Sequence, residues 1–193
     1  MSRFPFPIPY GWFHVGYSAE LSSGEVRAVR YFGRDLALWR DQDGNAHLQD
    51  AYCPHLGANI AVGGKVVGNL IECPFHQWRF TGEGRVAEID YAQRLNDKAC
   101  LPTYPVLERH GVVMAWYHPQ GVAPLYQLPD VPECSNPEFV GPISTGHTIR
   151  TCLQEMAENT ADAAHFVTIH RHPGQAHYDE FSFDGPSMIM KST

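Results

Sequence analysis

The chain has 193 residues, of which 44% are hydrophobic, and a formal net charge of −7 at pH 7. This length allows one large domain, or one domain and part of a second. The negative charge and the lack of a Lys/Arg cluster argue against nucleic acid or an anionic membrane as a partner. No run approaches the roughly 20 apolar residues that span a bilayer, and prolines interrupt the first residues, so the sequence predicts a soluble, cytoplasmic protein.

Short strands separated by turn signals dominate the first part of the chain. Asp43-Gly44-Asn45 and Thr81-Gly82-Glu83-Gly84 are typical of hairpin turns. Together they predict a mostly β domain, a small sandwich or barrel with loops at one end. The strands are expected at residues 26–32, 36–40, 46–50, 69–73, 79–80 and 112–117.

Two loops each carry one cysteine and one histidine. Cys53 and His55 stand in the first loop and, after seventeen intervening residues, Cys73 and His76 stand in the second, a C-x-H-x17-C-x2-H pattern. Two thiolates and two imidazoles in this order suit a [2Fe-2S] cluster in which the cysteines bind one iron and the histidines bind the other, a Rieske centre. Glycines and prolines around them predict tight turns whose amide N–H groups point at sulfur. The chain is therefore predicted to handle single electrons.

A structural zinc ion is the alternative for four such ligands. Zinc fingers usually pair cysteine with cysteine and histidine with histidine along the chain, whereas here each loop supplies one of each. Zinc is therefore the less favoured interpretation. Respiratory Rieske proteins join their ligand loops by a disulfide, but the corresponding positions here hold Ala58 and Phe75. The remaining cysteines, at positions 100, 134 and 152, are expected to be reduced.

Residues 119–142 contain six prolines and no periodic apolar pattern, which predicts a linker or crossover. A further strand is expected at residues 145–150 and a helix at residues 151–169, which are rich in helix-forming residues. The helix carries an N-x2-D-x2-H-x4-H pattern. Two histidines and a carboxylate are the ligands of non-haem Fe(II) oxygenases.

The two histidines in this pattern, His165 and His170, are spaced so that they cannot lie on the same face of a straight helix. On a straight helix they lie about 140° apart, whereas Asp162 and His165 lie about 60° apart. The two imidazoles can converge only if the helix bends or stops between them, and the sequence predicts this near Thr168.

These motifs resemble the terminal oxygenase (α) component of Rieske non-haem iron oxygenases, over nearly the whole chain. Residues 51–59 and 71–78, and the later Ile89-Asp90-Tyr91-Ala92, look most like the steroid-acting branch, which includes 3-ketosteroid 9α-hydroxylase oxygenase and cholesterol 7-desaturase. The resemblance implies an α+β chain: a mostly antiparallel β Rieske domain at residues 11–118, the linker at 119–142, and the start of an α/β catalytic domain at 143–193.

The resemblance also implies cofactors and roles. The cofactors are a [2Fe-2S] cluster and a mononuclear Fe(II). The mononuclear iron is bound by His165 and His170. Asp162 bridges, by hydrogen bonds, the cluster histidine of a neighbouring subunit in a homotrimer and a histidine ligand of this iron, and Asn159 places an amide nearby. The cluster ligands carried over are Cys53, Cys73, His55 and His76.

The family takes its third iron ligand from an Asp or Glu far downstream. Only 23 residues follow His170, and the carboxylates among them, Asp179, Glu180 and Asp184, lie too close in sequence to match. We therefore expect the chain to be a fragment of a longer oxygenase. Without the carboxylate, two histidines should bind Fe(II) weakly.

The implied activity is hydroxylation or desaturation of a hydrophobic, steroid-like substrate, using O2 and electrons from a ferredoxin or flavin reductase. The alternative is a non-enzymatic electron carrier similar to Rieske ferredoxins, for which residues 11–117 would suffice. The extension that carries the second histidine pair favours the oxygenase. A zinc-stabilised interaction module is the third possibility, and it predicts a colourless protein.

Overall fold

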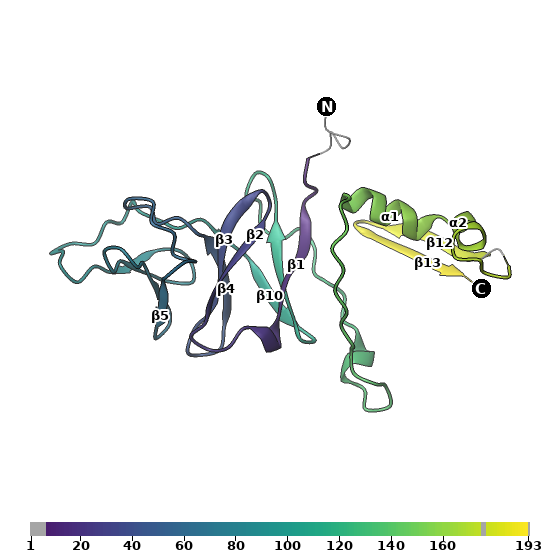
Figure 1. Cartoon of the computed structure of the whole chain (residues 1–193), viewed down its shortest axis with the longest axis horizontal. Helices are drawn as coiled ribbons and strands as arrows, with labels where there is room; N and C mark the ends of the chain where they lie inside the picture. Colours follow the sequence, from purple (N-terminus) through teal and green to yellow (C-terminus); the bar gives the residue numbers. More distant parts are fainter. Residues whose placement is uncertain (1–6, 175–176, 193) are drawn as a thin grey trace. The chain divides into compact units, whose positions relative to one another are not determined.

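The computed structural model describes residues 7–174 and 177–192. The chain divides into two compact units, one formed by residues 7–142 and the other by the described residues from Ile143 onward (Figure 1). Each unit has its own sheets. The strands of the first unit are β1 (Gly11–Tyr17), β2 (Val26–Tyr31), β3 (Arg34–Arg40), β4 (Ala46–Asp50), β5 (Lys65–Val67), β6 (Leu70–Glu72), β7 (Arg79–Phe80), β8 (Val86–Glu88), β9 (Thr103–Tyr104), β10 (Val106–Arg109) and β11 (Val112–Tyr117).

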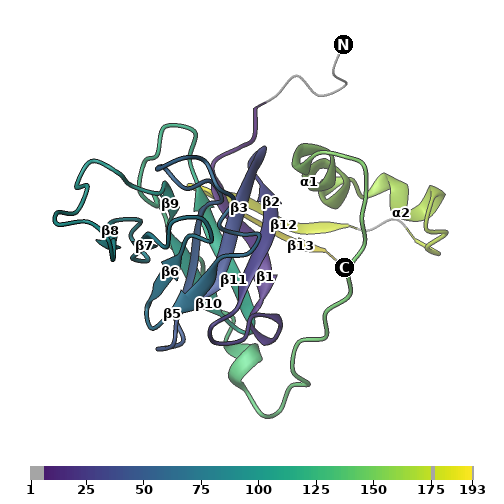
Figure 2. The same ribbon diagram turned by 60° about the vertical axis from the view of Figure 1, so that its left-hand side comes forward.

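The first unit is built from three antiparallel sheets, ordered β2-β3-β4-β9, β1-β11-β10 and β5-β6-β7-β8. Figure 2 shows β5 to β8 close together, beside the longer strands of the other sheets. The chain passes from the first sheet to the second between β9 and β10, at Pro105. Proline has no N–H to continue a ladder, so it suits a point where a strand changes sheets. The predicted fold class, mostly antiparallel β in this part, is confirmed.

Both predicted hairpin turns are present. The residues around Gly44 join β3 to β4, and those around Gly84 join β7 to β8, each as an antiparallel pair. Gly84 has a φ of +80°, and a Cβ there would lie 2.0 Å from the carbonyl oxygen of Leu101. Only glycine fits this turn, because a side chain would strain the backbone and would clash with the carbonyl of Leu101.

Two hydrophobic clusters form the core of the first unit. One packs β1, β3, β4 and β11 together, around Val15, Leu36 and Val113. The other lies beneath the two ligand loops and includes both predicted cysteine ligands. Its buried members are Ala37, Trp39, Cys53, Ile60, Ile71, Cys73, Trp78, Phe80, Ile89 and Leu101.

Arg40 links two of the sheets. Its guanidinium donates two hydrogen bonds of 2.8 Å from β3 to the carboxylate of Glu108 on β10, and a third, of 2.7 Å, to the carbonyl of Leu21. Most of the guanidinium is buried. Two parallel hydrogen bonds of this kind fix the angle between the guanidinium and the carboxylate, so the ion pair fixes the position of one sheet relative to the other.

Residues 119–142, where the sequence predicts a linker, group with the first unit and contact it. Trp12 donates from its indole nitrogen to the carbonyl of Tyr126 at 3.1 Å, and Trp116 packs edge-on against the Tyr126 ring. Arg109 donates to the carbonyl of Leu128 at 3.1 Å. A short 3-10 helix, Pro132–Ser135, lies within this stretch.

The second unit contains helices α1 (Leu153–Ala161) and α2 (Ala164–Thr168) and a hairpin of β12 (Tyr178–Asp184) and β13 (Ser187–Ser192). The predicted strand at residues 145–150 is wrong: these residues are exposed and irregular. The helix ends at Thr168, as predicted, but a second interruption at Asp162 and Ala163 was not foreseen. In residues 7–174 and 177–192, no helix is long and apolar enough to cross a membrane.

Candidate metal centres

The first ligand loop is a tight turn closed by two backbone hydrogen bonds. The N–H of Cys53 donates to the carbonyl of Ala58, and the N–H of Gly57 donates to the carbonyl of Cys53, both at 2.9 Å. Gly57 has a φ of +74°, which glycine adopts without strain. The loop therefore reverses the chain within five residues and leaves His55 at its tip.

The second ligand loop repeats this geometry. The N–H of Cys73 donates to the carbonyl of Trp78 at 2.9 Å, and the N–H of Gln77 donates to the carbonyl of Cys73 at 3.1 Å. The residue in the left-handed conformation is here Gln77, with a φ of +56°. Two separate stretches of sequence, both beginning with Cys-Pro, thus fold into matching turns, each with its cysteine at the base and its histidine at the tip.

Both cysteines lie at the buried side of the site. Cys53 is 3% exposed and Cys73 is 2% exposed. Burial, together with contact with the Cys73 thiol, raises the pKa of Cys53 to about 11, although the backbone N–H groups of His55 and Leu56 act on it in the opposite direction. Without metal the thiol therefore keeps its proton, and a bound metal must displace it.

The two histidines face each other at the outer side. The rings of His55 and His76 have centroids 4.7 Å apart and planes inclined by 65°, and both residues are half-buried. The site has two thiols within the core and two imidazoles toward solvent. This arrangement of sulfur on one side and nitrogen on the other fits a cluster held by two cysteines and two histidines, with backbone N–H groups turned toward the sulfur.

In the second unit, the histidine pair converges because the helix stops. After α2 ends, the N–H of His170 donates to the carbonyl of His165 at 3.4 Å, forming a turn one residue wider than an α-helical turn. The ring centroids of His165 and His170 are consequently 5.1 Å apart. A straight helix would hold them on different faces.

Asp162 lies beside this pair. Its carbonyl oxygen accepts a hydrogen bond from Nδ1 of His165, and its carboxylate lies 3.6 Å from the same nitrogen. A hollow of about 830 Å³ brings together the four predicted residues Asn159, Asp162, His165 and His170, with Met156 among the apolar residues that line it. Over the described part of the chain, no three His, Cys, Asp or Glu side chains surround a single metal position.

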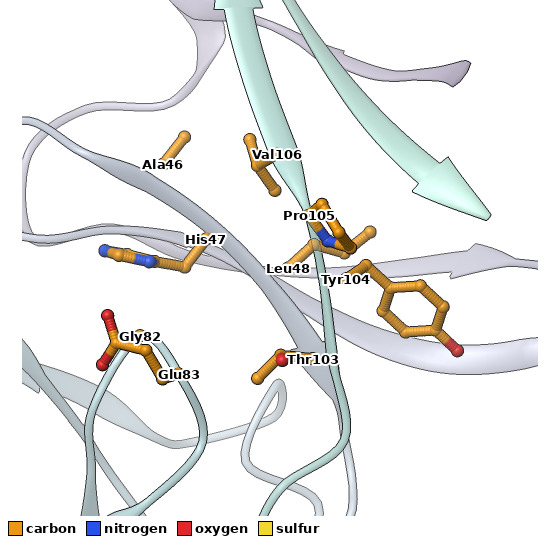
Figure 3. Close-up of a pocket in the computed structure, with 9 residues that line it drawn as sticks. All are labelled: Ala46, His47, Leu48, Gly82, Glu83, Thr103, Tyr104, Pro105 and Val106. Atoms are coloured by element: carbon orange, nitrogen blue, oxygen red, sulfur yellow. The ribbon is translucent and has the colours of Figure 1, made fainter. Parts of the chain in front are cut away.

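A third polar site, which the sequence did not predict, lies at a hollow of about 300 Å³ in the first unit. Figure 3 shows the imidazole of His47 above the turn of Gly82 and Glu83, with Thr103 across the hollow. Nε2 of His47 lies 3.0 Å from the buried carboxylate of Asp41, and a Cβ at Gly82 would lie 2.3 Å from the ring. The ring of His47 also stacks on Trp39, with centroids 4.3 Å apart, so contacts between residues distant in sequence place His47 here.

Two family models match consecutive parts of the chain, and the boundary between them lies before the boundary between the two compact units. The family described as "Rieske [2Fe-2S] domain" matches residues 11–105, and "3-Ketosteroid 9alpha-hydroxylase C-terminal domain" matches residues 115–193. A cholesterol 7-desaturase from Xenopus laevis is 43% identical over 163 residues, covering 84% of this chain and 36% of that protein. A probable 3-ketosteroid-9-alpha-monooxygenase oxygenase component from Rhodococcus rhodochrous is 37% identical over 187 residues, covering 94% and 46%.

Among solved structures, that of dicamba monooxygenase with non-heme iron and dicamba is similar, with a TM-score of 0.57 and 25% identity. The likeness covers 66% of this chain and 38% of that chain. The present chain therefore spans less than half of the length of each of these relatives.

Proposed function

We propose that the chain belongs to the Rieske non-haem iron oxygenases and forms the electron-accepting part of such an oxygenase and the beginning of its catalytic iron site. Its similarity to steroid-acting members supports this proposal. The proposed substrate is hydrophobic and steroid-like, and the reaction is hydroxylation or desaturation with O2. The names of the relatives, a cholesterol desaturase and a ketosteroid monooxygenase component, support this substrate class. One observation carries the proposal: two matching turns present two buried thiols and two facing imidazoles.

We assign Cys53 and Cys73 to one iron of a [2Fe-2S] cluster, and His55 and His76 to the other. When bound, such a cluster accepts and releases one electron at a potential of roughly −150 to +300 mV. The chain holds the sulfur ligands in a dry core and directs backbone N–H groups at Cys53. Burial raises the pKa of the Cys53 thiol, so the cluster must displace its proton on binding.

The imidazoles form the exposed side of the site, which is where an electron donor can approach. We propose a ferredoxin or a flavin reductase as this donor. The net charge of −7 and the lack of a Lys/Arg cluster in the sequence argue against nucleic acid, so we propose proteins and small molecules as the partners. We also propose a cytoplasmic location, which suits five cysteines that all remain unpaired thiols in the structure.

We assign His165 and His170 to the mononuclear iron, which supplies O2 activation when bound. The hydrogen bond from Nδ1 of His165 to the carbonyl of Asp162 fixes the tautomer of the ring and leaves Nε2 as its free nitrogen. We also propose a homotrimer, in which the carboxylate of Asp162, 53% exposed, would face a second subunit. Asn159, on the last turn of α1, offers an amide to the same hollow.

An electron carrier without turnover is the second candidate. The first unit alone contains both ligand loops, and the second unit presents two histidines with no third ligand in the described residues. Metal content distinguishes the two functions, since about two irons per chain indicate the cluster alone and about three indicate an occupied second site.

The test is iron and acid-labile sulfide content with visible and EPR spectra of the purified chain. We expect two inorganic sulfides per chain and a Rieske-type spectrum. His76→Ala should abolish the spectrum, whereas His147→Ala, which alters an exposed histidine outside both pairs, should retain it. A colourless, zinc-containing protein, or equal spectra in the two variants, would refute the assignment.

A further inference from the structure

The two imidazoles at the candidate cluster site have different neighbours. The ring of His55 stacks on the indole of Trp78, with centroids 4.4 Å apart and planes within 7° of parallel. Trp78 is buried in the core beneath the loops. His76 instead lies at a tilt against Phe75, which is exposed. Only one of the two histidines therefore rests on a fixed surface.

The indole of Trp78 is itself held by Tyr91. Its Nε1–H donates to the Tyr91 hydroxyl at 2.7 Å. A buried indole N–H needs an acceptor, and this hydroxyl is the one that the described residues offer it. Rotation of the indole away from its stack on His55 would break this hydrogen bond, so the hydroxyl restrains the plane of both rings.

A short turn places Tyr91 for this contact. The N–H of Ala92 donates to the carbonyl of Ile89 at 3.0 Å, which makes Asp90 and Tyr91 the central residues of the turn. Ile89 is buried in the same core, and the carboxylate of Asp90 lies 3.7 Å from the guanidinium of Arg79. The turn is thus anchored at two points beside Trp78, although Tyr91 itself is 64% exposed.

We propose that Tyr91 is a positioning residue for the cluster: acting through Trp78, it fixes the plane of the His55 imidazole and hence the orientation of one iron–nitrogen bond. This rests on the proposed function, because it requires His55 to be a cluster ligand. It assigns a role to Ile89-Asp90-Tyr91-Ala92, a motif that supplies no ligand itself. Partners that orient a metal-binding imidazole tune the metal without touching it.

The experiment is EPR of the reduced, cluster-loaded chain, with pulsed measurement of the two histidine nitrogen couplings. Tyr91→Phe removes the hydroxyl and keeps the ring, so we expect unchanged iron and sulfide content, a shift in the coupling of one nitrogen, and an altered g-anisotropy. Tyr52→Phe is the matched control. Tyr52 is also a partly exposed tyrosine, directly before Cys53, but its hydroxyl donates to Asp35 and not toward Trp78.

A second variant tests whether Tyr91 acts on His55 through Trp78. Trp78→Phe keeps an aromatic ring but has no N–H, so it should shift the same nitrogen coupling, and adding Tyr91→Phe to it should produce no further shift. If Trp78→Phe does not assemble a cluster, the comparison of Tyr91→Phe with Tyr52→Phe decides alone. Unchanged couplings in Tyr91→Phe, or equal shifts in the two tyrosine variants, overturn the proposal. A wild-type chain without a Rieske spectrum refutes the proposed function instead.

Discussion

Glu72→Gln should weaken the base of the second ligand loop. Glu72 is the last residue of β6, directly before Cys73, and its carboxylate is 4% exposed. Arg79 donates to one carboxylate oxygen at 2.7 Å, and Lys65 lies 3.0 Å from the other. Because Arg79 directly follows Trp78, this ion pair ties together the two strands that enter and leave the loop.

The magnitude follows from the burial of Glu72. Removing one partner of a buried ion pair costs about 3–5 kcal/mol, because the other charge loses its compensation. Glutamine keeps the shape and one acceptor oxygen, and Arg79 retains Glu88, so we expect a loss of about 2–3 kcal/mol in the free energy of unfolding. Glu88→Gln is the control: it removes another partner of Arg79, but Glu88 is 48% exposed, and exposed pairs contribute about 0–1 kcal/mol.

Urea unfolding followed by tryptophan fluorescence measures this loss. All four tryptophans lie in residues 7–142, so the signal reports on the first unit. A chelator and a reductant keep metal binding from adding to the measured stability. Equal losses in Glu72→Gln and Glu88→Gln, or a loss below about 1 kcal/mol in the first, would refute the argument from burial.

The same variant should change the acid dependence of stability. Burial alone would raise the pKa of Glu72, but the hydrogen bonds from Arg79 and Lys65 outweigh burial and lower it. A carboxylate whose pKa is lower in the folded state stabilises the fold above its unfolded-state pKa, and this stabilisation is lost as the pH falls through the folded-state pKa. Glu72→Gln should therefore lose stability mainly at neutral pH and approach the wild type in acid.

Three further predictions concern the loops and the second unit. Gly84→Ala should lower the free energy of unfolding by roughly 3 kcal/mol in the same urea assay, because a Cβ would clash with the Leu101 carbonyl. Gly111→Ala is the control: this glycine has the same φ of +80° but no atom near the added Cβ, so the loss should be about 1 kcal/mol. Gln77→Gly should stabilise the cluster-free chain by up to about 1 kcal/mol, and a loss would show that its side chain makes a needed contact. Because two histidines alone bind Fe(II) weakly, His170→Ala should abolish the binding of added Fe(II) beyond the cluster iron in a titration, without changing the cluster spectrum; loss of both would contradict separate sites.

The local features of the first unit could be predicted because they depend on a few neighbouring residues. Both hairpin turns carry glycine where the backbone needs it, and the ligand spacing alone identifies the two loops. The arrangement of the sheets could not be predicted in this way. β1 pairs with β11, which lies about a hundred residues later, and only their packing around shared core residues selects that partner.

In the second unit, a high content of helix-forming residues predicted one helix at residues 151–169 where the structure has two. The carboxylate of Asp162 accepts a hydrogen bond from the N–H of Ala164 at 2.9 Å, and Asp162 itself is extended. A short polar side chain that bonds its own backbone competes with the helix, so a capping signal was present within the predicted helix. The strand expected at residues 145–150 is absent for another reason: β12 and β13 pair with each other, and among the described residues no strand pairs with residues 145–150.

The difference between the two histidine supports follows from the likeness of the two loops. Ala58 and Trp78 occupy corresponding positions, since each accepts the hydrogen bond from its own loop's cysteine N–H. The two loops thus have the same backbone hydrogen bonds but different side chains, and Trp78 of the second loop covers the imidazole of His55 in the first. A methyl group at position 58 is too short to stack on His76 in return. Matched turns can therefore hold the sulfur ligands alike and the two imidazoles unequally, which is the asymmetry that Tyr91→Phe is designed to disturb.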